Sequence, residues 1–164
     1  STSDGGSTAD GGGGAGGEGG GEACLGDAGT PDACSSECEA ADIPGGVSTC
    51  DGVMHLRPGV AVAAVDCLNA LDENTCSSYM DGYMGCYLES LALACHDPAV
   101  EATCTTLATT CSTTDDDAWQ AECSKHLSGL SASGRAIVVA CLEGYCAPDG
   151  PFEYCVVDAY YDFD

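Results

Sequence analysis

The chain has 164 residues, of which 27 are acidic and only three are Lys or Arg, so its formal net charge at pH 7 is −24. This charge repels nucleic-acid phosphates and anionic lipid head groups, and we therefore expect no nucleic acid among the partners. Uninterrupted apolar runs such as residues 60–65 are far below the roughly 18 residues of a membrane-spanning helix, which argues against direct membrane insertion.

Residues 1–22 form a tail of glycine, serine, threonine and acids that has no side chain able to anchor a core. Glycine loses much backbone entropy on ordering, so the tail is expected to be a flexible linker when it is free. Two roles follow for it. It can carry a lipid anchor or another tether, or it can order by packing against a second copy of the chain.

The rest of the chain, residues 23–164, has the length of one domain, and its pattern predicts helices. Three helix-start signals place a capping side chain ahead of proline or acids: Thr30-Pro31-Asp32, Asp97-Pro98 and residues 113–117. The expected fold is mainly α, a compact disulfide-rich domain of five or six short helices behind the tail. The predicted helices are residues 31–41, 59–72, 76–95, 98–112, 115–128 and 135–146.

The cysteines are even in number, scattered, and never in the C-x-x-C spacing of redox enzymes and zinc ribbons. This usage predicts disulfides and an oxidising compartment, and the connectivity stays open. Cys104 and Cys111 share one helical face, as do Cys34 and Cys38, so each pair is expected to staple its helix to neighbours. The predicted disulfide cysteines are Cys24, Cys34, Cys38, Cys50, Cys67, Cys76, Cys86, Cys95, Cys104, Cys111, Cys123, Cys141, Cys146 and Cys155.

Tyrosine and methionine recur at helical spacing within the predicted helix 76–95, with Gly82 and Gly85 between them. Such a stripe suits a contact surface, but core packing explains the same spacing and is favoured over an interface. The aromatic C-terminal segment fits either a strand added to a partner or a helical face. The interface candidates are Tyr79, Met80, Tyr83, Met84, Tyr87, Tyr160, Tyr161 and Phe163.

No motif identifies a reaction or a cofactor. The three histidines are not in metal-binding spacing, and the run Gly129 to Gly134 misses the serine-elbow pattern by one position, so it fits a serine-capped loop before a helix better. We expect no cofactor, and bound calcium is the alternative. For residues 115–117, a helix cap competes with calcium binding as the explanation of the three aspartates. The calcium candidates are Asp115, Asp116, Asp117, Asp158, Asp162 and Asp164.

The layout of a Gly/Ser/Thr/Asp tail before acidic, alanine-rich helices with spaced cysteines resembles cysteine-rich surface lipoproteins of predatory and soil deltaproteobacteria, notably myxobacteria. The stretch CSKHLSGLSASGRAIVVACLEGYC, residues 123–146, is part of that resemblance. It implies export, and it transfers no specific activity.

The leading expectation is a non-enzymatic extracellular or cell-surface structural protein that assembles with itself into a homo-oligomer, filament or surface layer through its tail and its aromatic C-terminal segment. One alternative is a tethered surface binding module that responds to calcium. Another is a secreted hydrolase or its inhibitor.

Overall fold

The computed structural model describes residues 24–35, 49–76, 82–111, 117–145 and 155. Within these ranges the chain is helical, with no strand and only two isolated β-bridges, which confirms the predicted mainly α fold. Two short 3₁₀ helices, η2 (Asp51–His55) and η3 (Pro98–Val100), accompany the α-helices. These are α1 (Pro58–Ala70), α2 (Glu73–Cys76), α3 (Tyr83–Ala92), α4 (Glu101–Thr110), α5 (Asp117–Gly129) and α6 (Ala132–Tyr145).

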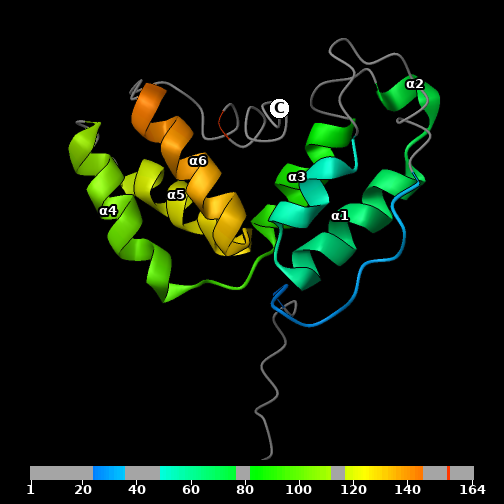
Figure 1. Cartoon of the computed structure of the whole chain (residues 1–164), viewed down its shortest axis with the longest axis horizontal. Helices are drawn as coiled ribbons and strands as arrows, with labels where there is room; N and C mark the ends of the chain where they lie inside the picture. Colours follow the sequence, from blue (N-terminus) through cyan, green and yellow to red (C-terminus); the bar gives the residue numbers. More distant parts are fainter. Residues whose placement is uncertain (1–23, 36–48, 77–81, 112–116, 146–154, 156–164) are drawn as a thin grey trace, which may run out of the picture.

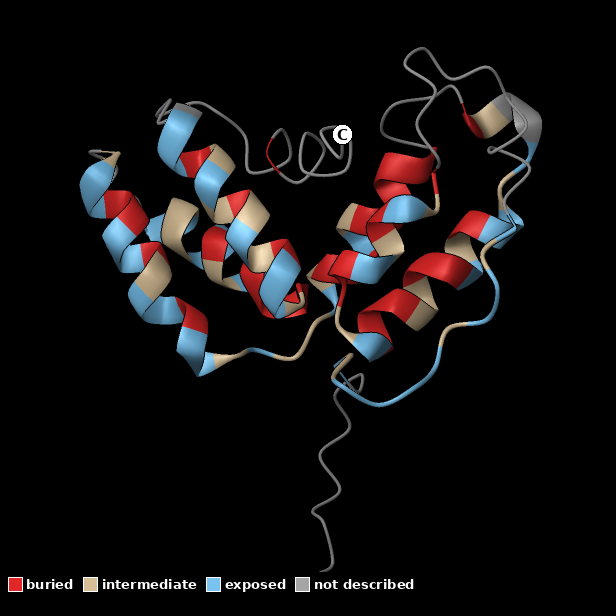
Figure 2. Cartoon of the chain, viewed as in Figure 1, coloured by how far each residue is buried: buried red, intermediate tan, exposed pale blue. Residues whose placement is uncertain are grey.

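The α-helices form two groups that lie side by side (Figure 1). In one group α1 packs along α3, and in the other α4 packs against both α5 and α6. Contact between α3 and α5 joins the groups, and η2 bridges them by touching α1 and α6. The buried residues face the interior of each group and the place where the groups meet (Figure 2).

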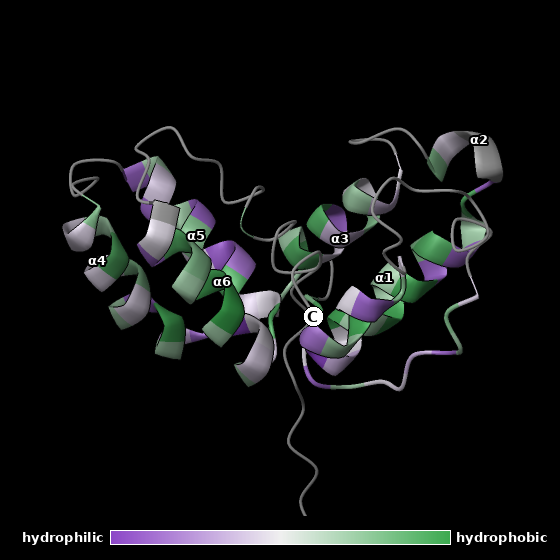
Figure 3. Ribbon diagram, turned by 45° about the horizontal axis from the view of Figure 1, so that its top comes forward, coloured by the Kyte–Doolittle hydropathy of each residue, from purple (hydrophilic) through white to green (hydrophobic). Residues whose placement is uncertain are grey.

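Helix α1 shows how the sequence specifies this packing. Pro58 occupies the first turn, where its missing N–H costs no hydrogen bond. Five apolar side chains then recur at spacings of one, three and four, which places them on one face of the helix. All five are buried: Val60, Ala61, Ala64, Val65 and Leu68. Figure 3 shows the same hydrophobic faces turned inward in both groups.

The described part of the tyrosine and methionine stripe, Tyr83, Met84 and Tyr87, lies in the core, which agrees with the core-packing explanation of the stripe. Tyr83 is 8 % exposed, Met84 is fully buried, and Tyr87 is 1 % exposed. The Tyr87 hydroxyl donates a 2.6 Å hydrogen bond to the Thr49 carbonyl, so its polar end is satisfied inside the domain. These three side chains are therefore not available to a partner in the folded chain. Tyr79 and Met80 lie outside the described residues.

The predicted helix 31–41 is wrong for residues 31–35, which are extended. Contacts with α1, which is distant in sequence, override the helix-start signal at Pro31. The Asn69 side chain in α1 accepts from the Ser35 N–H at 2.8 Å and donates to the Ala33 carbonyl at 3.1 Å, which uses backbone groups that a helix would need. A disulfide between Cys34 and Cys50 holds the same segment.

Disulfides staple neighbouring helices, as the cysteine pattern predicts. Cys67–Cys86 joins α1 to α3 and Cys104–Cys123 joins α4 to α5, each across 19 residues of sequence. Cys76 and Cys111 are also disulfide-bonded. The remaining described bridges are Cys24–Cys95, Cys34–Cys50 and Cys141–Cys155. Bridges of this kind require an oxidising compartment.

The described surface exposes few large hydrophobic side chains. Its only exposed large hydrophobic side chains are Met54, at 71 %, and Leu93, at 52 %. In the part of the chain that the structure describes, no helix is long and apolar enough to cross a membrane.

Candidate attachment site at the junction of the helical groups

The first described segment, residues 24–35, runs as an extended strap beside α1 (blue in Figure 1), and we call it the strap. Its first residue, Cys24, is bonded to Cys95, which lies in the connection between the two helical groups. The strap also pairs with the chain around Cys95 as a short parallel bridge. The Leu25 N–H donates to the Leu93 carbonyl at 2.8 Å, and the Cys95 N–H donates to the Leu25 carbonyl at 2.7 Å.

Glycines let the strap approach the first turn of α1 more closely than side chains would permit. The Gly59 N–H donates to the Gly26 carbonyl at 2.8 Å. A Cβ at position 59 would lie 2.6 Å from the Gly26 oxygen and 3.0 Å from the Ala28 oxygen, both backbone atoms. Gly29 has a φ of 121°, a conformation that L side chains rarely adopt, and it packs against Val62 one turn further along α1.

Arg57, immediately before α1, ties the strap to the end of α5. Its Nε and Nη2 donate to the two carboxylate oxygens of Asp27 at 2.7 and 2.8 Å, a bidentate pair. Its Nη1 donates to the Ser128 carbonyl at 3.2 Å, and its backbone N–H donates to the Gly129 carbonyl at 2.9 Å. The hydrogen bond from Arg57 lowers the pKa of the Asp27 carboxyl below its usual value.

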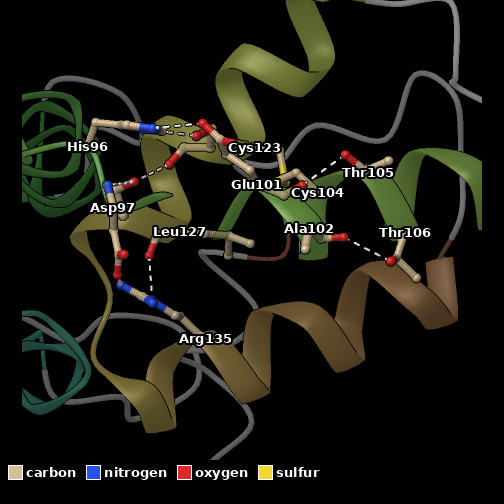
Figure 4. Close-up of a disulfide and its surroundings, with 12 residues drawn as sticks. His96, Asp97, Glu101, Ala102, Cys104, Thr105, Thr106, Cys123, Leu127 and Arg135 are labelled. Carbon is tan, nitrogen blue, oxygen red and sulfur yellow. Dashed lines mark hydrogen bonds and ion pairs between the residues drawn. A yellow bond between two sulfur atoms is a disulfide. The ribbon is translucent and has the colours of Figure 1, made fainter. Parts of the chain in front are cut away.

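Arg135, in the first turn of α6, fixes the same region from the other group (Figure 4). Its Nη2 donates to the Asp97 carboxylate at 2.5 Å, and its Nε donates to the carbonyls of Leu127 and Leu130 at 2.9 and 3.2 Å. Asp97 is held twice more, because its N–H donates to the Ser128 hydroxyl and its side chain accepts from the Ala99 N–H. The Ala99 N–H and then Arg135 lower the pKa of the Asp97 carboxyl. The Asp97 side chain thus caps η3, as predicted.

Two further glycines let helix ends touch here. A Cβ at Gly129 would lie 2.6 Å from Leu91 Cδ2 in α3, and a Cβ at Gly134 would lie 2.4 Å from the His55 carbonyl oxygen in η2. The Gly134 N–H donates to the Ser131 hydroxyl at 3.3 Å, which fits the serine-capped loop expected there. We use the term junction for this meeting place of the strap with the start of α1, the end of α3, the end of α5 and the start of α6.

A second cluster, on the surface beside the junction, joins His96, Glu101 and Ser124 (Figure 4). His96 Nε2 lies 3.0 Å from a Glu101 carboxylate oxygen, and the Ser124 hydroxyl lies 3.3 Å from His96 Nδ1. The residue types are those of a serine hydrolase. However, the His96 and Glu101 side chains are 54 % and 64 % exposed, so water solvates both and screens their attraction. We assign the cluster no catalytic role.

An open groove of about 240 Å³ lies between α4 and α6, lined by Thr103 and Thr106 on one side and by Val139 and Glu143 on the other. The Thr106 hydroxyl already donates to the Ala102 carbonyl in its own helix. That hydroxyl proton is therefore already used within α4.

The predicted site residues are only partly within the described chain. Asp117 is exposed in the first turn of α5, where an acidic side chain suits the helix dipole. The described residues contain no group of three or more metal-ligating side chains. The other candidates fall outside the described ranges: Asp115, Asp116, Asp158, Asp162 and Asp164 for calcium, and Tyr160, Tyr161 and Phe163 for an interface.

The sequence reasoning did not identify Arg57 and Arg135 as site residues. Their rarity was the available signal, because a chain with three Lys or Arg residues and 27 acids has few cations to place. Comparison with protein-family models, with curated proteins and with solved structures finds no match to this chain.

Proposed function

We propose that this chain is a non-enzymatic extracellular structural protein in which the glycine-rich tail is a tether and the helical domain is its covalently reinforced head. The single observation that carries the proposal is the Cys24–Cys95 bridge. It joins the first cysteine after the tail to the connection between the helical groups, so it leads directly into the junction.

The placement of this bridge determines how tension on the tail would enter the domain. A pull on Cys24 reaches Cys95 through a covalent bond before it reaches the hydrogen bonds of the strap. From Cys95 the tension passes to a region that both helical groups share, where Arg57 and Arg135 connect α1, α5 and α6. The strap is consequently not peeled from its end one hydrogen bond at a time.

The exported location is the second part of the proposal. The disulfides need an oxidising compartment, and each closed loop restricts the unfolded chain, which typically stabilises a fold by roughly 2–4 kcal/mol. A domain that is held at a distance from its attachment, outside the reach of intracellular chaperones, benefits from such durability.

Force spectroscopy on the full oxidised chain tests the tether. One handle is attached at Ser1, and the other is attached through an unnatural amino acid at Met54, which is exposed and lies in η2. The C24S/C95S double variant should show an extra lengthening at low force, because the ten residues from Leu25 to Cys34 can then peel away. Their full extension sets an upper limit of about 35 Å.

The matched control is the C34S/C50S double variant, which removes the bridge at the other end of the strap. It should show no extra lengthening, because Cys24 still holds the tail at Cys95. Circular dichroism establishes first that both variants fold. If the two variants lengthen equally, the tail is not anchored through Cys24–Cys95 and the tether proposal fails.

Self-association is a separate proposal, and it depends on the tail and on Tyr160, Tyr161 and Phe163. The described surface offers it little support, because only Met54 and Leu93 are large, apolar and exposed there. Light scattering together with electron microscopy decides the matter. If the protein is a dispersed monomer at every salt and calcium concentration, the self-association proposal is refuted and the tether proposal is unaffected.

A further inference from the structure

We propose that Cys24–Cys95 is an exchangeable disulfide, the site at which a dithiol reductant acts on the native fold, and that its opening lengthens the tether. The inference rests on the proposed tether function and adds a chemical means of regulating it.

Among the bridges that the structure describes, this one contains the most exposed cysteine residue. Thiol–disulfide exchange requires a thiolate to reach a sulfur atom, so access controls the rate. Cys24 is the only exposed residue among the twelve described cysteines, and its partner Cys95 is half-buried. In contrast, Cys104 and Cys123 are both buried, and Cys67 and Cys141 are each bonded to a buried partner.

The closest competitor is Cys34–Cys50, in which both residues are half-buried. Hydrogen bonds hold the strap next to both cysteines. Cys34 lies between Ala33 and Ser35, whose backbone groups are held by the Asn69 side chain. Leu25, which follows Cys24, is held by backbone hydrogen bonds to Leu93 and Cys95, so it is the exposure of Cys24 that distinguishes the two bridges. A reductant should therefore reach Cys24 first.

The exchange proceeds in two balanced steps. One thiolate of the dithiol attacks Cys24 Sγ, forms a mixed disulfide with it and releases the Cys95 thiolate, which takes a proton from water. The second thiolate of the reagent then attacks its own sulfur in that mixed disulfide and releases the Cys24 thiolate, which is protonated in turn. The reagent leaves as a cyclic disulfide, having supplied two electrons, and an oxidised dithiol reverses the sequence.

Opening this bridge leaves the helical core covalently intact. Cys67–Cys86 still joins α1 to α3, and Cys104–Cys123 still joins α4 to α5. The strap then depends on its hydrogen bonds at Leu25 and Gly26 and on the ion pair between the exposed Asp27 and the half-buried Arg57. Under tension it can peel as far as Cys34, and without tension it can dock again.

The order of reduction tests the chemistry. The oxidised full chain is treated with graded dithiothreitol in native buffer, quenched with iodoacetamide and mapped after cleavage at acidic residues, because three Lys or Arg residues give too few tryptic peptides. We expect Cys24 and Cys95 to be alkylated together, about tenfold or more faster than Cys34 and Cys50, while the helical circular dichroism is unchanged. Earlier labelling of another bridge, or simultaneous labelling of all bridges, would overturn the proposal.

Pulling on the selectively reduced chain separates the two proposals. Reduction should reproduce the lengthening of the C24S/C95S variant, and reoxidation should abolish it. If the variant lengthens but dithiothreitol does not open this bridge first, the exchange site is wrong and the tether stands. If the bridge opens first and no lengthening follows, the tether is wrong.

Discussion

Replacing Gly59 with alanine tests directly whether the strap packs on α1. In a helix without tertiary contacts, Gly→Ala stabilises by up to about 1 kcal/mol. Here the added Cβ would lie 2.6 Å from the Gly26 oxygen and 3.0 Å from the Ala28 oxygen, so the strap backbone has to move. Loss of the 2.8 Å bond from the Gly59 N–H costs about 1 kcal/mol, and overpacking costs about 1–3 kcal/mol.

The expected net effect of G59A is a destabilisation of about 1–3 kcal/mol in the free energy of unfolding. Gly144 in α6 provides the matched control, because a Cβ there meets nothing within 4 Å. G144A should stabilise by up to about 0.5–1 kcal/mol. Urea unfolding of the oxidised chain, followed by circular dichroism, measures both. If G59A stabilises as G144A does, the strap does not pack against α1 and the reasoning is refuted.

Three other predictions concern the junction and the buried histidines. Arg135→Lys keeps the positive charge beside Asp97 but removes the planar guanidinium that also donates to two carbonyls. Urea unfolding should show that the free energy of unfolding decreases by about 1–3 kcal/mol. An unchanged unfolding midpoint would contradict this prediction. Gly134→Ala places a Cβ 2.4 Å from the His55 carbonyl oxygen and should lower the thermal midpoint, whereas an unshifted midpoint would show that α6 does not touch η2 there. Burial lowers the pKa of His55 and of His126, so at mildly acidic pH the unfolded chain binds protons on these two side chains that the native chain does not bind. The histidines therefore do not reduce the free energy of unfolding when the pH is above the unfolded pKa of about 6.5. As the pH drops below that value, the free energy of unfolding decreases by up to about 1.4 kcal/mol per histidine per pH unit, until the pH reaches the lowered native pKa. Unfolding curves from pH 7.5 to 5.5 check this, and a H126Q variant should show a shallower slope than the parent.

Local patterns predicted most of the helices. The segment predicted at 59–72 is α1, 135–146 overlaps α6, and 98–112 contains η3 and α4. Proline, capping side chains and apolar spacing act within a few residues of one another, so they can be recognised in one dimension. Within the predicted helix 76–95, α3 covers Tyr83–Ala92 and Cys76 belongs to α2, while residues 77–81 lie outside the described residues.

The strap and the junction depend on contacts that no local pattern shows. Thr30-Pro31-Asp32 is a sound helix-start signal, but Asn69 and Cys50 hold the following residues extended from far along the chain. Cysteine usage predicted disulfides, yet the pairing of Cys24 with Cys95 spans 71 residues and follows from the fold alone.

The stripe at Tyr83 and Met84 is a similar case. Its spacing places the side chains on one helical face, and only the packing of α3 against α1 and α5 decides that this face is inside.

The position of the arginines has a consequence for how copies of the protein would share a crowded surface. Arg57 and Arg135 are two of the three Lys and Arg residues, and both lie half-buried in the junction, each against a carboxylate. The exterior is left with Lys125 against many acids, so neighbouring domains should repel over about one Debye length, roughly 10 Å in 0.1 M salt and 30 Å in 0.01 M salt. The lateral spacing of tethered copies would then respond to the ionic strength around them, closing as salt rises and opening as it falls.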